Sequence, residues 1–156
     1  MAILRKGSVP ETVGAASYPA PYTLPAERLS WRHLTEAGGL TQFGIALETL
    51  APGGQSSQPH WEEHEDEFLY LLDGQLTVIE DGQETLIGPG DACCWPANSP
   101  VAHALRNDSD RPVTYLIAGS RDPRNICHYP GLDLLATPEG YTRLDGTPYP
   151  SKGASE

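Results

Sequence analysis

The chain has 156 residues, a formal net charge of −11, 16 glycines and 15 prolines. This length is that of one ordinary domain with its own hydrophobic core, and so many turn-forming residues favour short strands over long helices. An acidic surface repels nucleic-acid phosphates and anionic membranes, so we expect neither as a partner.

The three cysteines, Cys93, Cys94 and Cys127, do not suggest a disulfide framework, because their number is odd and two of them are adjacent. We expect free thiols in a reducing compartment. The N-terminus lacks the sustained apolar segment of a secretory signal, and no apolar run approaches the ~20 residues of a membrane span. The sequence therefore predicts a cytoplasmic protein.

The N-terminal third of the chain begins without a regular pattern. Prolines interrupt any helix within residues 1–29, so we expect an irregular arm in which Tyr18 and Tyr22 can dock onto the domain or onto a second subunit. A short strand is predicted at residues 30–34. Apolar and polar residues alternate at residues 42–50, which predicts a half-buried strand.

The middle of the chain is a series of predicted strands. Residues 67–72 form the most apolar one, which we expect to be buried. The Asp73-Gly74 and Asp81-Gly82 steps predict hairpin turns. Further strands are expected at residues 75–80, 83–87, 92–95, 101–107 and 112–119. Many short strands without a long helix indicate a β-sandwich or barrel. The pattern then decays, so residues 121–156 should be an ordered but irregular tail.

The most informative stretch is residues 59–67, Pro-His-Trp-Glu-Glu-His-Glu-Asp-Glu, which places two imidazoles and five acids directly before the apolar strand. Imidazole nitrogens and carboxylate oxygens bind divalent ions such as zinc, iron(II), manganese or nickel. His60 and Glu62 share one face of an extended strand, whereas Glu67 needs a turn or bulge to rejoin that face. His103, on a separate strand, is the obvious further ligand.

These residues fall at the spacing of two motifs of the cupin superfamily, which the chain resembles. The first motif, roughly G(X)5HXH(X)3–4E(X)6G, is matched by Gly54, His60, Glu62, Glu67 and Gly74. The second, roughly G(X)5PXG(X)2H(X)3N, is matched by Gly90, Pro96, His103 and Asn107. The likeness covers residues 54–107 and, with flanking strands, about 40–120. The Ser-Tyr-Pro step at residues 17–19 is similar to that of small single-domain bacterial cupins of the cupin-2 type.

Two departures from the motifs affect the expected site. Glu62 replaces the second histidine of the first motif, which changes the ligand set toward oxygen and favours harder ions such as manganese or iron(II). The second motif has Asn98 in place of glycine, and a longer gap before His103. This loop change should leave His103 on its strand. His64 is an alternative to Glu62 as the replacement for the missing histidine.

The resemblance implies an all-β jelly-roll barrel, or double-stranded β-helix, in a single domain over residues 1–156. Its barrel core would cover about residues 40–120, with an arm at 1–29 and a tail at 121–156. The resemblance also implies a homodimer, and a divalent metal ion whose identity (Fe, Mn, Zn or Ni) stays open. The expected ligands of that ion are His60, Glu62, Glu67 and His103.

Three functions are compatible with these observations. The first is a metal-dependent enzyme acting on a small polar or acidic molecule, of dioxygenase, decarboxylase, lyase or isomerase type. The second is a non-catalytic module or sensor that binds a small ligand. The third is a structural barrel without metal. No glycine-rich phosphate loop and no G-x-S-x-G nucleophile elbow occurs in the sequence.

Overall fold

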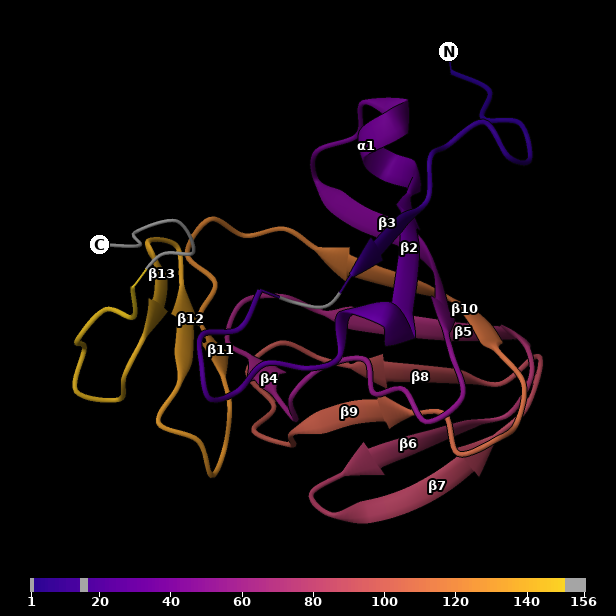
Figure 1. Cartoon of the computed structure of the whole chain (residues 1–156). Coiled ribbons are helices and arrows are strands. Elements are labelled where there is room, and N and C mark those ends of the chain that lie inside the picture. Colours follow the sequence, from indigo (N-terminus) through magenta and orange to yellow (C-terminus); the bar gives the residue numbers. More distant parts are fainter. Residues whose placement is uncertain (1, 15–16, 151–156) are drawn as a thin grey trace.

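The computed structural model describes residues 2–14 and 17–150, and it forms a jelly-roll barrel of antiparallel strands (Figure 1). The larger wall is a six-stranded sheet. Its strands, in spatial order, are β1 (Thr12–Gly14), β2 (Leu29–His33), β3 (Phe43–Leu50), β10 (Val113–Ser120), β5 (Glu67–Asp73) and β8 (Ala92–Trp95). The opposite wall is a three-stranded sheet of β7 (Gln83–Ile87), β6 (Leu76–Glu80) and β9 (His103–Arg106). All of these strands except β1 were predicted from the sequence to within a few residues.

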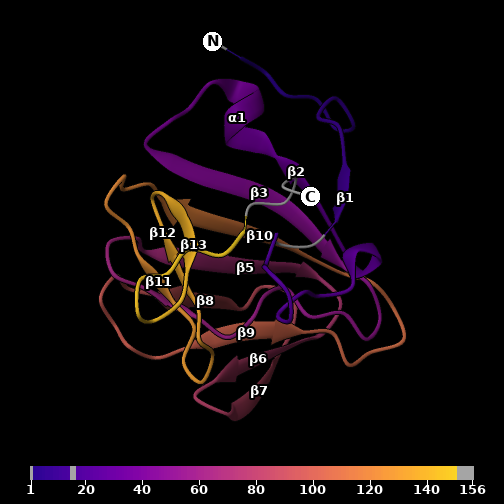
Figure 2. The same cartoon turned by 60° about the vertical axis from the view of Figure 1, so that its left-hand side comes forward.

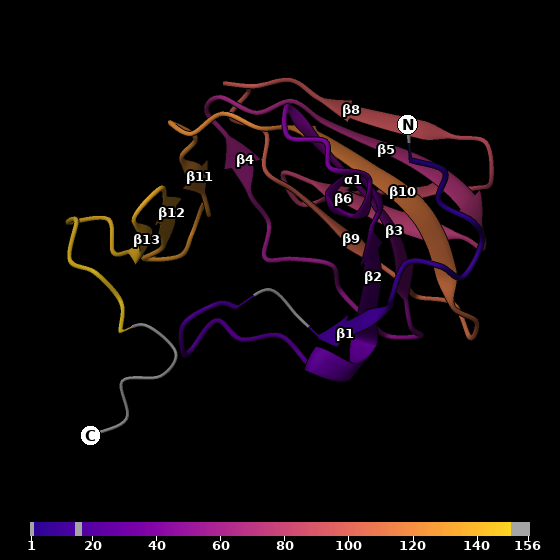
Figure 3. The ribbon, with the colours of Figure 1, turned by 90° about the horizontal axis from the view of Figure 1, so that it is seen from above.

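A third sheet closes one end of the barrel. Its order is β13 (Gly140–Thr142), β12 (Leu135–Thr137), β11 (Cys127–His128) and β4 (Trp61–Glu62). Three of these strands come from the C-terminal tail, which lies to one side of the barrel in Figure 3 and in front of it in Figure 2. Residues 121–150 of the tail are ordered, as predicted, but they are not irregular, and the expected fraying of the last few residues lies outside the described part of the chain. Strands of two or three residues are too short to produce a visible hydrophobic period.

The N-terminal arm docks onto this tail sheet through aromatic side chains. Tyr18 is 3% exposed and packs edge-on against Tyr129, with ring centroids 5.5 Å apart. Together with Cys127 and Leu134 they form a hydrophobic cluster separate from the barrel core. The predicted docking of Tyr18 is therefore confirmed, and the arm and the tail are held together by aromatic packing.

Two short helices were not predicted. They are the 3₁₀ turn η1 (Ala26–Arg28) and the helix α1 (Leu34–Gly38), which lies above β3 in Figure 1. Both are too short to show helical periodicity. Gly39 ends α1 in the left-handed conformation, with φ of 74°. In residues 2–14 and 17–150, none of the helices has the length and hydropathy of a membrane span.

The barrel core lies between the two walls and takes side chains from both. Leu69 and Leu71 of β5 are fully buried in it and pack in one cluster with Val78 of β6. The alternate residues of β5 face outward: Phe68, Tyr70 and Leu72 are 39–42% exposed. The expectation of a buried β5 strand is therefore wrong for half of its side chains, because only one face of this sheet is covered.

The two Asp-Gly steps behave differently. Asp81 and Gly82 both have positive φ and join β6 to β7 as a hairpin, as predicted. The hairpin prediction for Asp73-Gly74 is wrong, because β5 pairs with β10 and β8 rather than with β6. The chain turns there from one wall of the barrel to the other. The conformation of Gly74, with φ of 91°, permits this corner.

Candidate metal centre

Three separate segments bring His60, Glu67 and His103 together at one end of the barrel. His60 directly precedes β4, Glu67 is the first residue of β5, and His103 is the first residue of β9. Each of the three offers one ligand atom, and these atoms all lie within 4.8 Å of one another. The bend at residues 63–66 between β4 and β5 supplies the turn that Glu67 was expected to need.

The distances within this group suit a shared ion. Nε2 of His103 lies 3.4 Å from Oε1 of Glu67, and Nε2 of His60 lies 3.8 Å from Oε2 of Glu67. Two donors bound to one ion at about 2.1 Å are roughly 3.0–3.4 Å apart. The residues therefore fit a divalent metal with only small movements of their side chains.

Neighbouring groups fix both imidazole rings. Nδ1 of His60 lies 3.0 Å from the Gln58 carbonyl oxygen, to which it can donate a hydrogen bond, so that Nε2 is available as a ligand. The His103 ring is 3% exposed and stacks on Trp95, with centroids 3.9 Å apart and planes 7° apart. Nε1 of Trp95 in turn donates a 2.8 Å hydrogen bond to Glu80. These contacts hold both rings in a defined orientation.

Even without an ion, the side chains of this group shift one another's pKa values. Burial raises the pKa of Glu67, but the hydrogen bonds and charges of the two histidines outweigh burial and lower this pKa to about 2. Burial lowers the pKa of His60, but the neighbouring Glu67 carboxylate outweighs burial and raises it. In the metal-free protein Glu67 is thus ionised, and its carboxylate contacts both imidazole rings.

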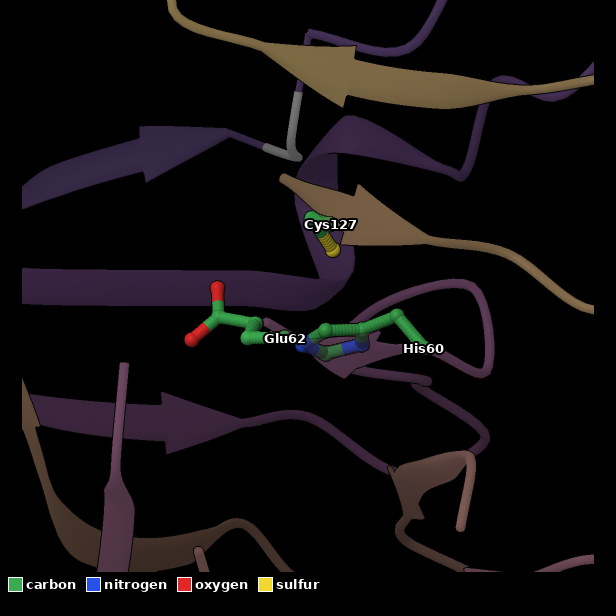
Figure 4. A group of neighbouring side chains, drawn as sticks. All are labelled: His60, Glu62 and Cys127. Carbon is green, nitrogen blue, oxygen red and sulfur yellow. The ribbon is translucent and has the colours of Figure 1, made fainter. Parts of the chain in front are cut away.

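Glu62 lies in a second, overlapping group. Its carboxylate falls within 4.8 Å of ligand atoms of His60 and Cys127 (Figure 4). Burial and the charge of Glu67 raise the pKa of Glu62 to about 7. His60 is therefore common to both groups, whereas Glu62 approaches the site from the side of the tail sheet.

His64, the alternative to Glu62, lies apart from these ligand groups. Its Nδ1 atom is 3.8 Å from Glu63, whose carboxylate also accepts a 2.7 Å hydrogen bond from Nε2 of His128. Trp61 stacks on His128 with parallel rings 4.2 Å apart, on the face opposite to His60. His64 and Trp61 therefore belong to the packing between β4 and the tail.

Two residues near this site were not predicted from the sequence. One of them shares a cavity with the site, and the other holds the first by a hydrogen bond. The cavity, of about 410 Å³, is lined by His60, Glu67, His103 and also Glu48 of β3. Tyr115, fully buried on β10, donates a 2.8 Å hydrogen bond to Oε2 of Glu48. Burial raises the pKa of Glu48 to about 7, despite the opposing effect of this hydrogen bond. A carboxyl group among the apolar residues of β3 was the available signal.

Comparisons with known proteins show the family to which this chain is similar. Residues 46–119 match the family described as a Cupin domain. A crystal structure of a sugar phosphate isomerase of the cupin superfamily from Silicibacter pomeroyi is 33% identical. It superposes with a TM-score of 0.87 over 97% of this chain and 98% of the other.

Two curated proteins are similar in sequence. Quercetin 2,3-dioxygenase from Bacillus subtilis is 33% identical over 79 residues, which are 51% of this chain but only 23% of that protein. The chain thus matches about a quarter of the length of this dioxygenase. A β-D-galactosidase from Mycobacterium tuberculosis is 29% identical over 75% of this chain and 91% of its own length. The relatives thus differ widely in the activities for which they are named.

Proposed function

This chain belongs to the cupin superfamily, and on that premise we propose that it is a divalent-metal-dependent enzyme that transfers a proton on a small hydroxylated carbonyl compound. The observation that carries the proposal is one cavity, shared by the His60–Glu67–His103 group and by Glu48. A ligand group and a proton-transfer group that border one cavity are the two components that such a reaction requires.

The residues of the ligand group have defined roles in this proposal. His60, Glu67 and His103 would hold the ion, and Glu62 is the fourth candidate ligand. The bound ion would supply a Lewis acid for the carbonyl oxygen of the substrate. Gln58 keeps the His60 ring in the tautomer that can ligate, and Trp95 holds the plane of the His103 ring.

Glu48 is suited to remove and return the proton. A general acid or base works best when its pKa lies near the working pH, and the pKa of this carboxyl group is raised to about 7. The hydroxyl of Tyr115 donates a hydrogen bond that orients this carboxyl group. Isomerisation of a hydroxyaldehyde or hydroxyketone requires one such group to move a proton between adjacent carbons.

The cavity lining favours an uncharged substrate. Among the described residues that line it there is no lysine or arginine, whereas Ser56, Ser57 and Trp31 offer hydroxyl groups and an aromatic face. A phosphate group would find no lysine or arginine in this lining to pair with. We therefore propose a neutral sugar or similar polyol, although the relative from Silicibacter pomeroyi is named for sugar phosphates.

Deuterium exchange tests the proposal directly. Metal-loaded protein in D₂O, mixed with neutral aldoses and ketoses or with their phosphates, should incorporate deuterium next to the carbonyl group, as seen by NMR. Glu48→Gln should abolish exchange but keep the metal, and His64→Asn should keep both. Binding of a sugar without exchange would instead support a non-catalytic binding module, and consumption of oxygen would support a dioxygenase.

The homodimer expected from the resemblance stays a prediction. The outward side chains of β5, Phe68, Tyr70 and Leu72, form an exposed apolar face that a second copy would cover. Sedimentation velocity of the protein and of Tyr70→Glu would test this. A monomer at all concentrations would contradict the prediction.

A further inference from the structure

We propose that Cys127, from the C-terminal tail, is a ligand of the metal ion in this site, beside His60 and Glu62. The inference rests on the proposed metal site and adds a sulfur atom to it. The tail sheet would then supply one ligand of the ion. Figure 4 shows the sulfur of Cys127 directed from β11 toward the side chains of His60 and Glu62.

The backbone explains why these three side chains meet. His60 and Glu62 are two residues apart on an extended segment, so both point to one face. Cys127 pairs directly with Glu62 in the antiparallel ladder of β4 and β11. Directly paired residues of such a ladder project to the same face of the sheet. The group of His60, Glu62 and Cys127 thus follows from strand register rather than from a chance side-chain conformation.

The thiol also lies within reach of the other two side chains. Cys127 is 7% exposed, and its ligand atom lies within 4.8 Å of those of His60 and Glu62. Cys93 and Cys94, by contrast, lie on β8 and are in neither ligand group of the described residues. On binding, the thiol would lose its proton to solvent and the sulfur would donate an electron pair to the ion.

A sulfur ligand changes which ion the site prefers. Histidine and carboxylate ligands alone accept manganese or iron(II) readily, whereas a thiolate shifts preference toward zinc and other thiophilic ions. The replacement of a motif histidine by Glu62 would by itself favour harder ions. Cys127 would offset that change, so the preference for Zn(II) and Co(II) over Mn(II) should be larger in the wild type than in Cys127→Ser.

Cobalt substitution tests this assignment through a readout independent of activity. Co(II) added to the whole metal-free chain should produce an intense near-ultraviolet sulfur-to-cobalt charge-transfer band at one equivalent. Cys127→Ser, which keeps the size of the side chain, should lose this band. Cys94→Ser is the matched control and should retain it, because Cys94 is exposed on the outer face of β8.

X-ray absorption of the zinc-loaded wild-type protein covers the case in which Cys127→Ser does not fold. We expect one sulfur neighbour at about 2.3 Å, beside nitrogen and oxygen at about 2.0–2.1 Å. One equivalent of metal with only nitrogen and oxygen neighbours would overturn the role of Cys127 and leave the proposed site intact. Failure to bind any metal would overturn both.

Discussion

The backbones of His60 and His103 exchange two hydrogen bonds, from His60 N to His103 O at 3.0 Å and from His103 N to His60 O at 2.9 Å. They are the two members of an isolated antiparallel bridge, and their rings lie with centroids 4.7 Å apart. Because the main chain fixes this pair, the two imidazoles are positioned before any ion binds. Glu67 then needs only to reach between them.

The first prediction concerns the charge of Glu67. Glu67→Gln keeps the size of the side chain but removes the anion between His60 and His103, so we expect at least a 100-fold loss of affinity for Zn(II). Isothermal titration of metal-free protein measures this change. His64→Asn is the control and should bind as the wild type does. Equal affinity for the Gln variant and the wild type would remove Glu67 from the ligand set.

The second prediction concerns the ring that supports His103. Trp95→Leu removes the stacked indole, and we expect metal affinity to fall by about 10–100-fold because the imidazole is no longer held in place. Tyr70→Leu is the control, since Tyr70 lies on the outward face of β5. Its affinity for metal should be unchanged. Titrations should be made at a temperature at which circular dichroism shows both variants folded.

The third prediction concerns Glu48 and pH. Its pKa is raised from 4.5 to about 7 in the folded protein, so the folded state holds a proton that the unfolded state has already lost. Stability of the wild type should therefore fall as pH rises from about 4.5 to about 7. Glu48→Gln removes this contribution and should be more stable than the wild type by about 3 kcal/mol at pH 8, and about equal to it at pH 4.

Urea unfolding of metal-free protein between pH 4 and pH 8 measures this difference. Glu62 also has a raised pKa, but it titrates in both proteins, so its contribution largely cancels in the comparison. Glu27→Gln, at an exposed position, serves as the control for a simple change of net charge. A pH-independent difference between Glu48→Gln and the wild type would show that Glu48 is not buried as described.

The fourth prediction concerns the corner at Gly74. A Cβ atom there would lie 3.0 Å from Cγ2 and 3.1 Å from Cα of Val113, at a φ of 91°. Gly74→Ala should therefore cost about 2–4 kcal/mol of stability, from the backbone strain and the contact together. At Gly82, with φ of 80°, a Cβ would meet nothing within 4 Å. Gly82→Ala should cost only about 1 kcal/mol, and thermal unfolding of both variants separates strain from contact.

The sequence predicted the parts of the site that local spacing encodes. The i, i+2 relation placed His60 and Glu62 on one face, and a second motif placed His103 on another strand. The convergence of His60 with Glu67 depends on short-range features: a bend at residues 63–66 and a strand that begins at Glu67. These features are visible in a single stretch of sequence. His103 joins these two residues through its antiparallel bridge to His60.

The parts that sequence reasoning missed depend on pairing between distant strands. Glu48 meets Tyr115 because β3 pairs with β10, and Cys127 meets Glu62 because β11 pairs with β4. Alternation in β3 showed two faces but not which face lies inside the barrel. The Asp73-Gly74 error has the same origin, since an Asp-Gly step specifies a turn but not the strand that follows it as a partner.

The pairing of β11 with β4 has a consequence for metal preference among proteins related to this one. The proposed ligand Cys127 lies on a two-residue strand outside residues 46–119, the part matched by the family. Exchange of a single residue in this appended segment would alter the preferred ion while every barrel residue stayed the same. Among related proteins, ion selectivity would then follow their C-terminal extensions, and a comparison limited to the barrel would overlook it.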